Sequence, residues 1–258
     1  MQTLQEGIFT LAYDKLYRIK SYKPFEIIFY GSRARGDFTE FSDYNFYLLA
    51  HPTDQLNSGF VNEIAHALEY LESESAVSLV AGDVDSFQMR IKLFDPTVIH
   101  VCELGKLFYG DGEFIKICQE WQEVKKRPLQ IDSLISFLEN RYKFYKSLSP
   151  RGNKEDITRI ERILSLNIQI WILKNIEDIS LTELYYLDIP SRMLSLARTV
   201  YRSNSTKEFD LMLSIYEEIH KLKQILRIIS TDYKEKIEKI KDSISQIQDL
   251  SKILENIL

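Results

Sequence analysis

The change of character near residue 125 is the feature that most constrains this fold. Before it, short β-rich runs alternate with helical patterns, whereas after it only helical patterns continue and glycine almost disappears. The basic, proline-marked stretch Lys125–Pro128 lies at the joint. Strands followed by helices build a sheet, and a series of amphipathic helices packs as a bundle. The sequence therefore predicts an α+β chain, with a small mixed sheet and its helices over residues 1–125 and an all-α helical bundle over residues 126–258.

Four strand patterns and several helix patterns occur in the first half. The strand runs are 25–30, 43–50, 76–81 and 106–109, and the helical runs are 3–20, 56–72 and 96–104. Asp95 followed by Pro96 is a good helix start, because aspartate caps the first turn and proline needs no backbone donor there. Gly105 follows the last residue of that helical pattern. We therefore expect a sheet of short strands covered by helices.

The second half has four or five long helical patterns, at 131–148, 154–174, 192–201, 207–229 and 232–258. In the last one, isoleucine and leucine recur from Ile237 to Ile257 in steps of three and four, close to a heptad. Leaving such a stripe in water is unfavourable. It packs either on the chain's own helices or on a second copy of the chain, so a homodimer is one of two arrangements left open.

Composition excludes several broad classes of protein. The chain has a formal net charge of −5, so no overall field attracts nucleic acid and any phosphate site must be local. No run approaches the ~18 apolar residues of a membrane span, and the first residues lack a signal-peptide pattern. The two cysteines, Cys102 and Cys118, lie in helical segments and predict neither a disulfide framework nor a zinc site. We expect a cytoplasmic protein with no membrane partner and no extensive nucleic-acid surface.

The stretch Tyr30–Leu49, Y-GSRARG-DFTEF-SDYNFYLL, carries the strongest chemical signal. A glycine-serine pair closes a strand, and a basic loop with a second glycine follows. Gly31 allows a tight turn and a close approach of the backbone to a ligand. The Ser32 hydroxyl and the loop amides can donate to phosphate oxygens, and Arg33 and Arg35 add positive charge. This pattern predicts a phosphate-binding loop.

The strand after this loop carries a candidate metal ligand. Ten residues separate Ser32 from Asp43, which opens the strand. Residues 43 and 45 share one face because the side-chain period of a strand is two. Carboxylates at both positions would hold a pair of Mg²⁺ ions against a triphosphate. Position 45 is asparagine, whose amide oxygen carries no negative charge. Asp43 is therefore the expected metal ligand.

These residues resemble the signature of the polymerase-beta-like nucleotidyltransferase superfamily, and GSRARG…SD is similar to the minimal and the antibiotic nucleotidyltransferases. The later stretch CELGKLFYGDG, residues 102–112, also resembles a segment of that family. The likeness covers roughly residues 25–112 and implies a nucleotidyltransferase-type mixed sheet. It further implies Mg²⁺ as cofactor, a nucleoside triphosphate as substrate with ATP the expected one, and transfer of the nucleotide to a hydroxyl of a small molecule or protein.

The resemblance also implies the roles of single residues. The phosphate-binding residues would be Gly31, Ser32, Arg33 and Arg35; the metal ligand would be Asp43; and the catalytic pair would be Asp43 and Asn45. The family's third carboxylate lies within the third strand, where Ser78 stands in this chain. Asp83 and Asp85 would supply it if that strand runs longer than the pattern indicates.

Two functions therefore stay open. The first is an enzyme that transfers a nucleotide from Mg-NTP to a hydroxyl. The second is a catalytically inactive module that binds a nucleotide or a partner, with helices that regulate it or dimerise. A Walker loop is excluded because Asp37 and Phe38 stand where lysine and serine or threonine are needed. Glu103 is expected to be a solvated residue at a helix end, and the four histidines lack metal-ligand spacing.

Overall fold

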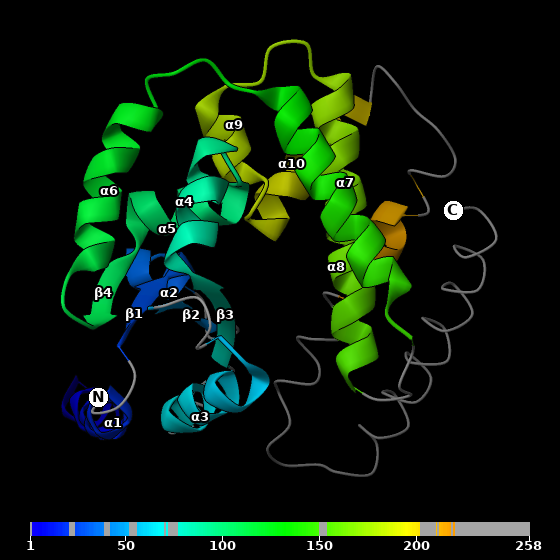
Figure 1. Ribbon diagram of the computed structural model, residues 1–258. Coiled ribbons are helices and arrows are strands. Elements are labelled where there is room, and N and C mark those ends of the chain that lie inside the picture. Colours follow the sequence, from blue (N-terminus) through cyan, green and yellow to red (C-terminus); the bar gives the residue numbers. More distant parts are fainter. Residues whose placement is uncertain are drawn as a thin grey trace, which may run out of the picture. The chain divides into compact units, whose positions relative to one another are not determined.

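The computed structural model describes residues 2–20, 24–38, 42–51, 56–69, 71, 77–149, 154–201, 210, 212–217 and 219 (Figure 1). The chain divides into two compact units, Met1–Leu129 and Gln130–Leu258. The first contains a four-stranded mixed sheet, and the described part of the second is helical. The predicted α+β class is confirmed. The predicted helix 232–258, with its stripe from Ile237 to Ile257, lies outside the described residues, as does most of the predicted helix 207–229.

The sheet has the strand order β3-β2-β1-β4. Its strands are β1 (Phe25–Tyr30), β2 (Tyr44–Ala50), β3 (Val77–Asp83) and β4 (Lys106–Tyr109). β1 is antiparallel to both β2 and β4, while β2 and β3 are parallel. A parallel pair needs a crossover connection, and α3 (Ser58–Leu68) lies in it. The strand patterns at 25–30 and 106–109 are confirmed at both ends, and β3 extends two residues beyond its predicted end.

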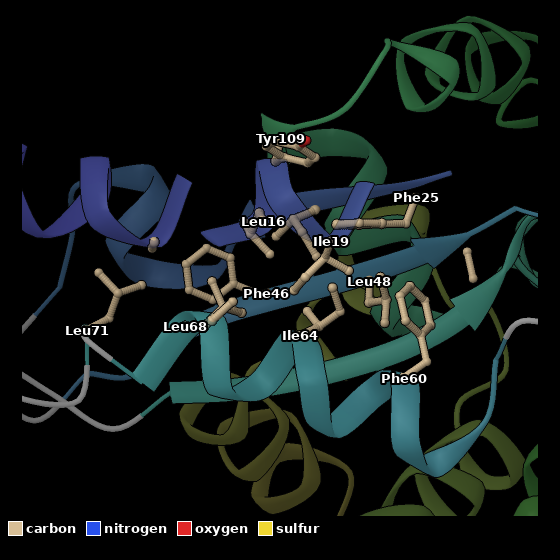
Figure 2. Close-up of a cluster of buried hydrophobic side chains, with 14 of the residues drawn as sticks. Leu16, Ile19, Phe25, Phe46, Leu48, Phe60, Ile64, Leu68, Leu71 and Tyr109 are labelled. Atoms are coloured by element: carbon tan, nitrogen blue, oxygen red, sulfur yellow. The ribbon is translucent and has the colours of Figure 1, made fainter. Parts of the chain in front are cut away.

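One face of the sheet is covered by hydrocarbon and aromatic rings (Figure 2). The helices on this face are α1 (Gln2–Lys20) and α3, which also contact each other. Side chains alternate between the two faces of a strand, so every second residue of β1 and β2 joins this core. The cluster includes Leu16, Phe25, Ile27, Phe46, Leu48, Phe60, Ile64 and Leu68, each at most 1% exposed.

The opposite face is covered by α4 (Val84–Lys92), α5 (Pro96–Leu104) and α6 (Glu113–Val124) (Figure 1). This face carries buried polar groups. Arg90 makes two hydrogen bonds to the carboxylate of Asp95, at 3.1 and 3.2 Å, and donates a third to the Tyr47 hydroxyl at 3.1 Å. Asp95 also caps α5 as predicted, since it accepts from the backbone of Thr97. The polar groups of this face are thus bound to one another.

Glu26 of β1 ties α6 to this same face. Its carboxylate is 2% exposed and accepts from four consecutive backbone amides, those of residues 111–114, at 2.5 to 2.9 Å. A helix leaves its first amides without intrahelical partners, and here a side chain 85 residues earlier in the chain supplies the acceptor. The α6 helix therefore begins where long-range packing places this carboxylate.

The described helices of the second unit are α7 (Ile131–Ser147), α8 (Lys154–Asn175), α9 (Leu181–Tyr186) and α10 (Pro190–Tyr201). α7 and α8 pack side by side, and α10 contacts α8 and α9 (Figure 1). The core of this unit includes Leu134, Leu138, Leu164, Ile168, Ile172 and Leu184. Across the described residues of both units, no helix combines the length and apolar character needed to cross a membrane.

Candidate functional site

The glycine-serine segment makes a sharp turn from β1 into a short helix. The sequence predicts a loop here, but residues Gly31–Arg35 form the helix α2, which starts directly after β1. Gly31 has φ +83°, and Gly36 ends the helix with φ +90°. A Cβ atom on Gly31 would lie 2.8 Å from the Asn45 Nδ2 atom. Glycine is required at position 31 both for its left-handed backbone and for the close approach of Asn45.

The strand register brings Asn45 and Ser78 next to each other. Asn45 pairs with Tyr30 on β1 and with Ser78 on β3. The flanking residues Tyr44 and Phe46 point into the apolar core, so Asn45 and Ser78 belong to the opposite face. The Asn45 amide also donates weakly to the backbone oxygen of Asp43, at 3.4 Å. Two of the three positions where the sequence resemblance implies carboxylates therefore carry an amide and a hydroxyl.

Asp83 and Asp85 do not reach this place. β3 does run as far as Asp83, but Asp83 pairs with Ala50 at the other end of the parallel strands. Five residues of strand separate it from Ser78, about 17 Å. The Asp83 carboxylate caps α4, where it accepts from the Ser86 amide at 2.8 Å. Asp85 follows in the first turn of α4. Neither residue supplies a third carboxylate beside Asn45.

Arg33, which was expected to bind phosphate, makes its contacts within the loop itself. Its Nε donates to the backbone oxygen of Ser42 at 2.7 Å. Its guanidinium lies over the ring of Tyr44 at 4.4 Å and over that of Phe38 at 4.8 Å. Tyr44 belongs to the apolar core. These contacts fasten the connection between α2 and β2, and they direct the charge of Arg33 toward two aromatic rings.

Arg35 links α2 to α5. Its Nε donates to the Asp37 carboxylate at 3.0 and 3.1 Å, and its Nη1 lies 3.0 Å from Nε2 of His100. A guanidinium can only donate, so a hydrogen bond between these two atoms has the His100 Nε2 as its acceptor. His100 is 4% exposed and packs edge-on against Tyr30. No spacing signal in the sequence connects position 35 with position 100, so only the structure reveals this pair.

The residues at the site do not fit a pair of Mg²⁺ ions. Two such ions bound to a triphosphate need several negatively charged ligands. Of the three positions Asp43, Asn45 and Ser78, only Asp43 has a carboxylate. Among the described residues, no group of three or more histidine, cysteine, aspartate or glutamate side chains is arranged to hold a metal. The chemistry open to this site is therefore that of hydrogen bonding and single charges.

Glu103 and the two cysteines connect α5 to α6. Glu103 accepts from the Trp121 indole at 2.6 Å and from Lys125 at 3.2 Å, so it is a structural tie and not only a solvated helix end. Cys102 lies in α5 and Cys118 in α6, and both are free thiols in the predicted helical segments. A hydrogen bond with Cys118 and burial raise the pKa of the Cys102 thiol. Both effects disfavour the thiolate form of Cys102.

Comparisons with known proteins give one structural likeness. No protein-family model matches the chain, and no curated protein matches it. A solved structure described as the crystal structure of the toxin-antitoxin with AMP-PNP contains a chain 21% identical to this one. The match covers 44% of this chain and 89% of that chain, with a TM-score of 0.29. A match with this TM-score carries no argument about the fold, so the description of the fold rests on the strand order and the registers given above.

Proposed function

We propose that the first unit is a polymerase-beta-like nucleotidyltransferase domain that binds a nucleoside triphosphate but has lost efficient nucleotide transfer. The observation that carries this proposal is the register of β2 and β3, which sets Asn45 directly beside Ser78. Two neutral side chains stand where the sequence resemblance implies two carboxylates. Of the two functions left open by the sequence, this arrangement favours the nucleotide-binding module over the enzyme.

Nucleotide binding is supported by the residues of the loop that match the nucleotidyltransferase signature. The left-handed Gly31 lets the backbone turn beside Asn45, and the partly buried Ser32 follows it at the start of α2. In this proposal the Ser32 hydroxyl donates to a phosphate oxygen, and Asn45 and Ser78 offer further hydrogen bonds. Arg35, at the end of α2, would reach a phosphate in exchange for its ion pair with Asp37. Arg33 holds the loop in place through Tyr44 and Ser42.

Loss of transfer is supported by the missing charges. A general base contributes typically about 10²- to 10⁴-fold to a rate, and Ser78 cannot replace it at neutral pH. An asparagine at position 45 leaves Asp43 as the one carboxylate among the three positions. The phosphates of a bound nucleotide would then be stabilised mainly by hydrogen bonds, because Arg33 is engaged by Tyr44 and Arg35 by Asp37.

Calorimetry with ATP, GTP, CTP and UTP, each with Mg²⁺ and with a chelator, tests the binding. We expect one or more of these nucleotides to bind in both conditions. Ser32→Ala should weaken binding by about tenfold, the loss of one hydrogen bond to a charged group. Ser136→Ala is the matched control, because Ser136 is an exposed serine of α7. The absence of binding by all four nucleotides would contradict the proposal.

Pyrophosphate release measures transfer directly. The protein is incubated with Mg²⁺ and the nucleotide that it binds, once with a mixture of small-molecule hydroxyl acceptors and once without them. The rate of pyrophosphate release is compared with the uncatalysed rate. We expect no release above the uncatalysed rate. Rapid, Ser32-dependent release would show that the chain is an active nucleotidyltransferase and that our assignment of Asn45 and Ser78 is wrong.

A further inference from the structure

The C-terminal half of α7 has a composition unlike the rest of the molecule. The stretch 140–154, NRYKFYKSLSPRGNK, contains five lysine or arginine residues and no acidic residue, in a chain whose formal net charge is −5. It also contains Tyr142, Phe144 and Tyr145. Cations and aromatic rings therefore alternate along one helix end, where the charge is strongly positive.

These side chains lie at the surface. The first half of α7 buries Leu134 and Leu138 against the unit's core, but no residue from Asn140 to Ser149 is buried. Phe144 is 59% exposed, and Lys143 and Lys146 are exposed as well. The Phe144 ring is therefore accessible to a ligand, and it lies between cations of the same helix.

The cations and rings of this helix end are packed with one another. The Arg141 guanidinium lies 5.7 Å from the centre of the Phe137 ring, and the Lys146 amine lies 5.8 Å from that of Tyr142. Phe144 and Tyr145 are in edge-on contact, with ring centres 5.5 Å apart. Arg159 of α8 reaches across the hairpin and donates to the backbone oxygen of Leu148. These contacts place Arg141 and Lys146 each beside an aromatic ring along the helix end.

We infer that this helix end, residues 141–148, is a binding surface for single-stranded nucleic acid. Proteins that bind single strands combine positive charge along the phosphate backbone with aromatic rings on which bases stack. Both parts are present here, on one helix end. The Phe144 ring is the expected stacking platform, and Lys143 and Lys146 are the expected phosphate contacts.

A lipid surface fits the same residues less well. Membrane-binding helices separate an apolar face from a basic face. Successive residues of α7 are turned by about 100°, so Lys143 and Lys146 lie on one side of the helix, about 60° apart, whereas Arg141 lies between Phe144 and Tyr145. Two of the three rings are tyrosines, which carry hydroxyl groups. Phe144 and Leu148 share one exposed side, but the charged Arg141 lies beside them, so this helix end offers only a short apolar face to a bilayer.

Fluorescence anisotropy of the full chain with a labelled single-stranded oligothymidylate tests this inference at several salt concentrations. We expect binding whose logarithmic salt slope becomes shallower by about 0.7 for each phosphate contact removed. The double variant Lys143→Gln/Lys146→Gln should therefore lower the slope by about 1.4. The matched control is Lys116→Gln/Lys126→Gln. These lysines are 72% and 66% exposed, and each lies three residues from the glutamate with which it forms an ion pair.

The second arm isolates stacking from charge. Phe144→Ala removes no charge and should weaken binding about fivefold or more, the effect of losing one stacked base. Ile115→Ala, at a 52% exposed apolar residue of α6, should leave binding unchanged. Because all these side chains are exposed, the variants should keep the helical signal of the wild type in circular dichroism.

Three results would overturn the inference. The oligothymidylate could fail to bind, or it could bind Lys143→Gln/Lys146→Gln as tightly as it binds the control Lys116→Gln/Lys126→Gln. Phe144→Ala could bind as tightly as Ile115→Ala, which would reduce the surface to unspecific charge attraction. Finally, vesicles of phosphatidylglycerol and phosphatidylcholine could bind more tightly than the oligonucleotide through the same residues. The inference does not rest on the nucleotide site, so the calorimetric result for Ser32→Ala leaves it unchanged.

Discussion

The two faces of the sheet come from the same strands, yet they are stabilised in different ways. The face under α1 and α3 is a packed cluster of hydrocarbon and aromatic side chains, with Phe46 and Leu48 fully buried. The face under α4, α5 and α6 holds the buried polar residues Glu26, Arg90 and Asp95. Contacts on the first face are non-directional and tolerate exchange of similar shapes, whereas those on the second face depend on individual donors and acceptors.

This difference explains where a ligand site can arise. On the polar face, Glu26 is bound by four backbone amides, and Arg90 by Asp95 and Tyr47. These groups are used by the fold itself. Toward the Gly31 end, the short neutral side chains of Asn45 and Ser78 stand side by side on neighbouring strands. The candidate site is thus a part of the polar face that carries small side chains in place of the large ion-paired groups.

Truncation on the apolar face should have the largest effect on stability. Phe46→Ala removes a fully buried ring that packs against Phe29 and Phe108, at ring-centre distances of 5.3 and 5.5 Å. We expect a loss of about 3–5 kcal/mol in the free energy of unfolding, from the lost transfer energy and the cavity left behind. Urea denaturation followed by Trp121 fluorescence measures it, in a Trp171→Phe background because each unit holds one of the two tryptophans.

Two controls define this result. Phe46→Leu keeps most of the volume and should cost clearly less than Phe46→Ala. Phe144→Ala truncates a ring that is 59% exposed and should change the free energy of unfolding by less than about 0.5 kcal/mol. A Phe46→Ala protein as stable as wild type would show that the ring is not part of a tightly packed core.

Removing the central carboxylate of the polar face should cost somewhat less but act locally. Glu26→Ala leaves four amides at the start of α6 without their acceptor, and an orphaned buried donor costs about 1–3 kcal/mol. Because three of these amides are only partly buried and can bind water, we expect a total near 3 kcal/mol. Hydrogen exchange at residues 111–114 should also accelerate beyond the change in global stability.

The exchange pattern distinguishes the two faces. In Phe46→Ala, the amides of residues 111–114 should exchange only through the general loss of stability, because their hydrogen bonds to Glu26 remain. Glu63→Gln alters an exposed glutamate of α3 and should leave both stability and exchange unchanged. Uniform acceleration across the sheet in Glu26→Ala would contradict the local role assigned to this carboxylate.

A single added methyl group should perturb the polar face by about 1–3 kcal/mol. A Cβ atom on Gly82 would fall on the hydroxyl oxygen of Tyr47. Gly82→Ala should therefore displace the tyrosine and break its 3.1 Å hydrogen bond from Arg90. In the double variant with Tyr47→Phe the clashing oxygen is absent, so the methyl group should cost much less there. Additive costs of the two substitutions, measured by urea denaturation, would show that the clash is relieved elsewhere.

The comparison of the faces also shows what the sequence alone could predict. The strand runs at 25–30 and 106–109 and the helix start at Asp95-Pro96 were readable because their signals are local: β-rich composition, a cap, a proline and a following glycine. α4 was not predicted, and for α6 the sequence indicated only a helical segment around Cys118, without its bounds. The start of α6 depends on Glu26, 85 residues away in sequence, and no local pattern at Gly110–Gly112 indicates it.

The turn that carries the candidate site was predictable from the sequence, but the contacts of its side chains were not. Glycine, serine and spacing locate the turn from β1 to β2, and the period of two places residue 45 on the face opposite to Tyr44. The sequence predicted Arg33 and Arg35 as phosphate ligands, because a cation in a loop is usually solvated and therefore available to a ligand. Their partners, Tyr44 for Arg33 and His100 for Arg35, follow from packing and long-range contact. Residue type alone could not show that these charges are already engaged.

The smallest expected effect is on ligand binding, at the uncommitted end of the polar face. Asn45→Asp, alone and with Ser78→Asp, restores carboxylates beside Asp43. Without a cation these charges repel one another, so the variants should bind the nucleotide somewhat more weakly in a chelator. With Mg²⁺ the added charges attract the cation, and the double variant should gain about tenfold in nucleotide affinity relative to the chelator. Calorimetry of both variants in both conditions measures this difference, with Asn62→Asp, at an exposed residue of α3, as a control for added charge. If the double variant shows the same affinity with Mg²⁺ and with a chelator, as wild type is expected to do, this end of the sheet is not a lapsed metal site. The resemblance to nucleotidyltransferases would then extend to the backbone of the turn and no further.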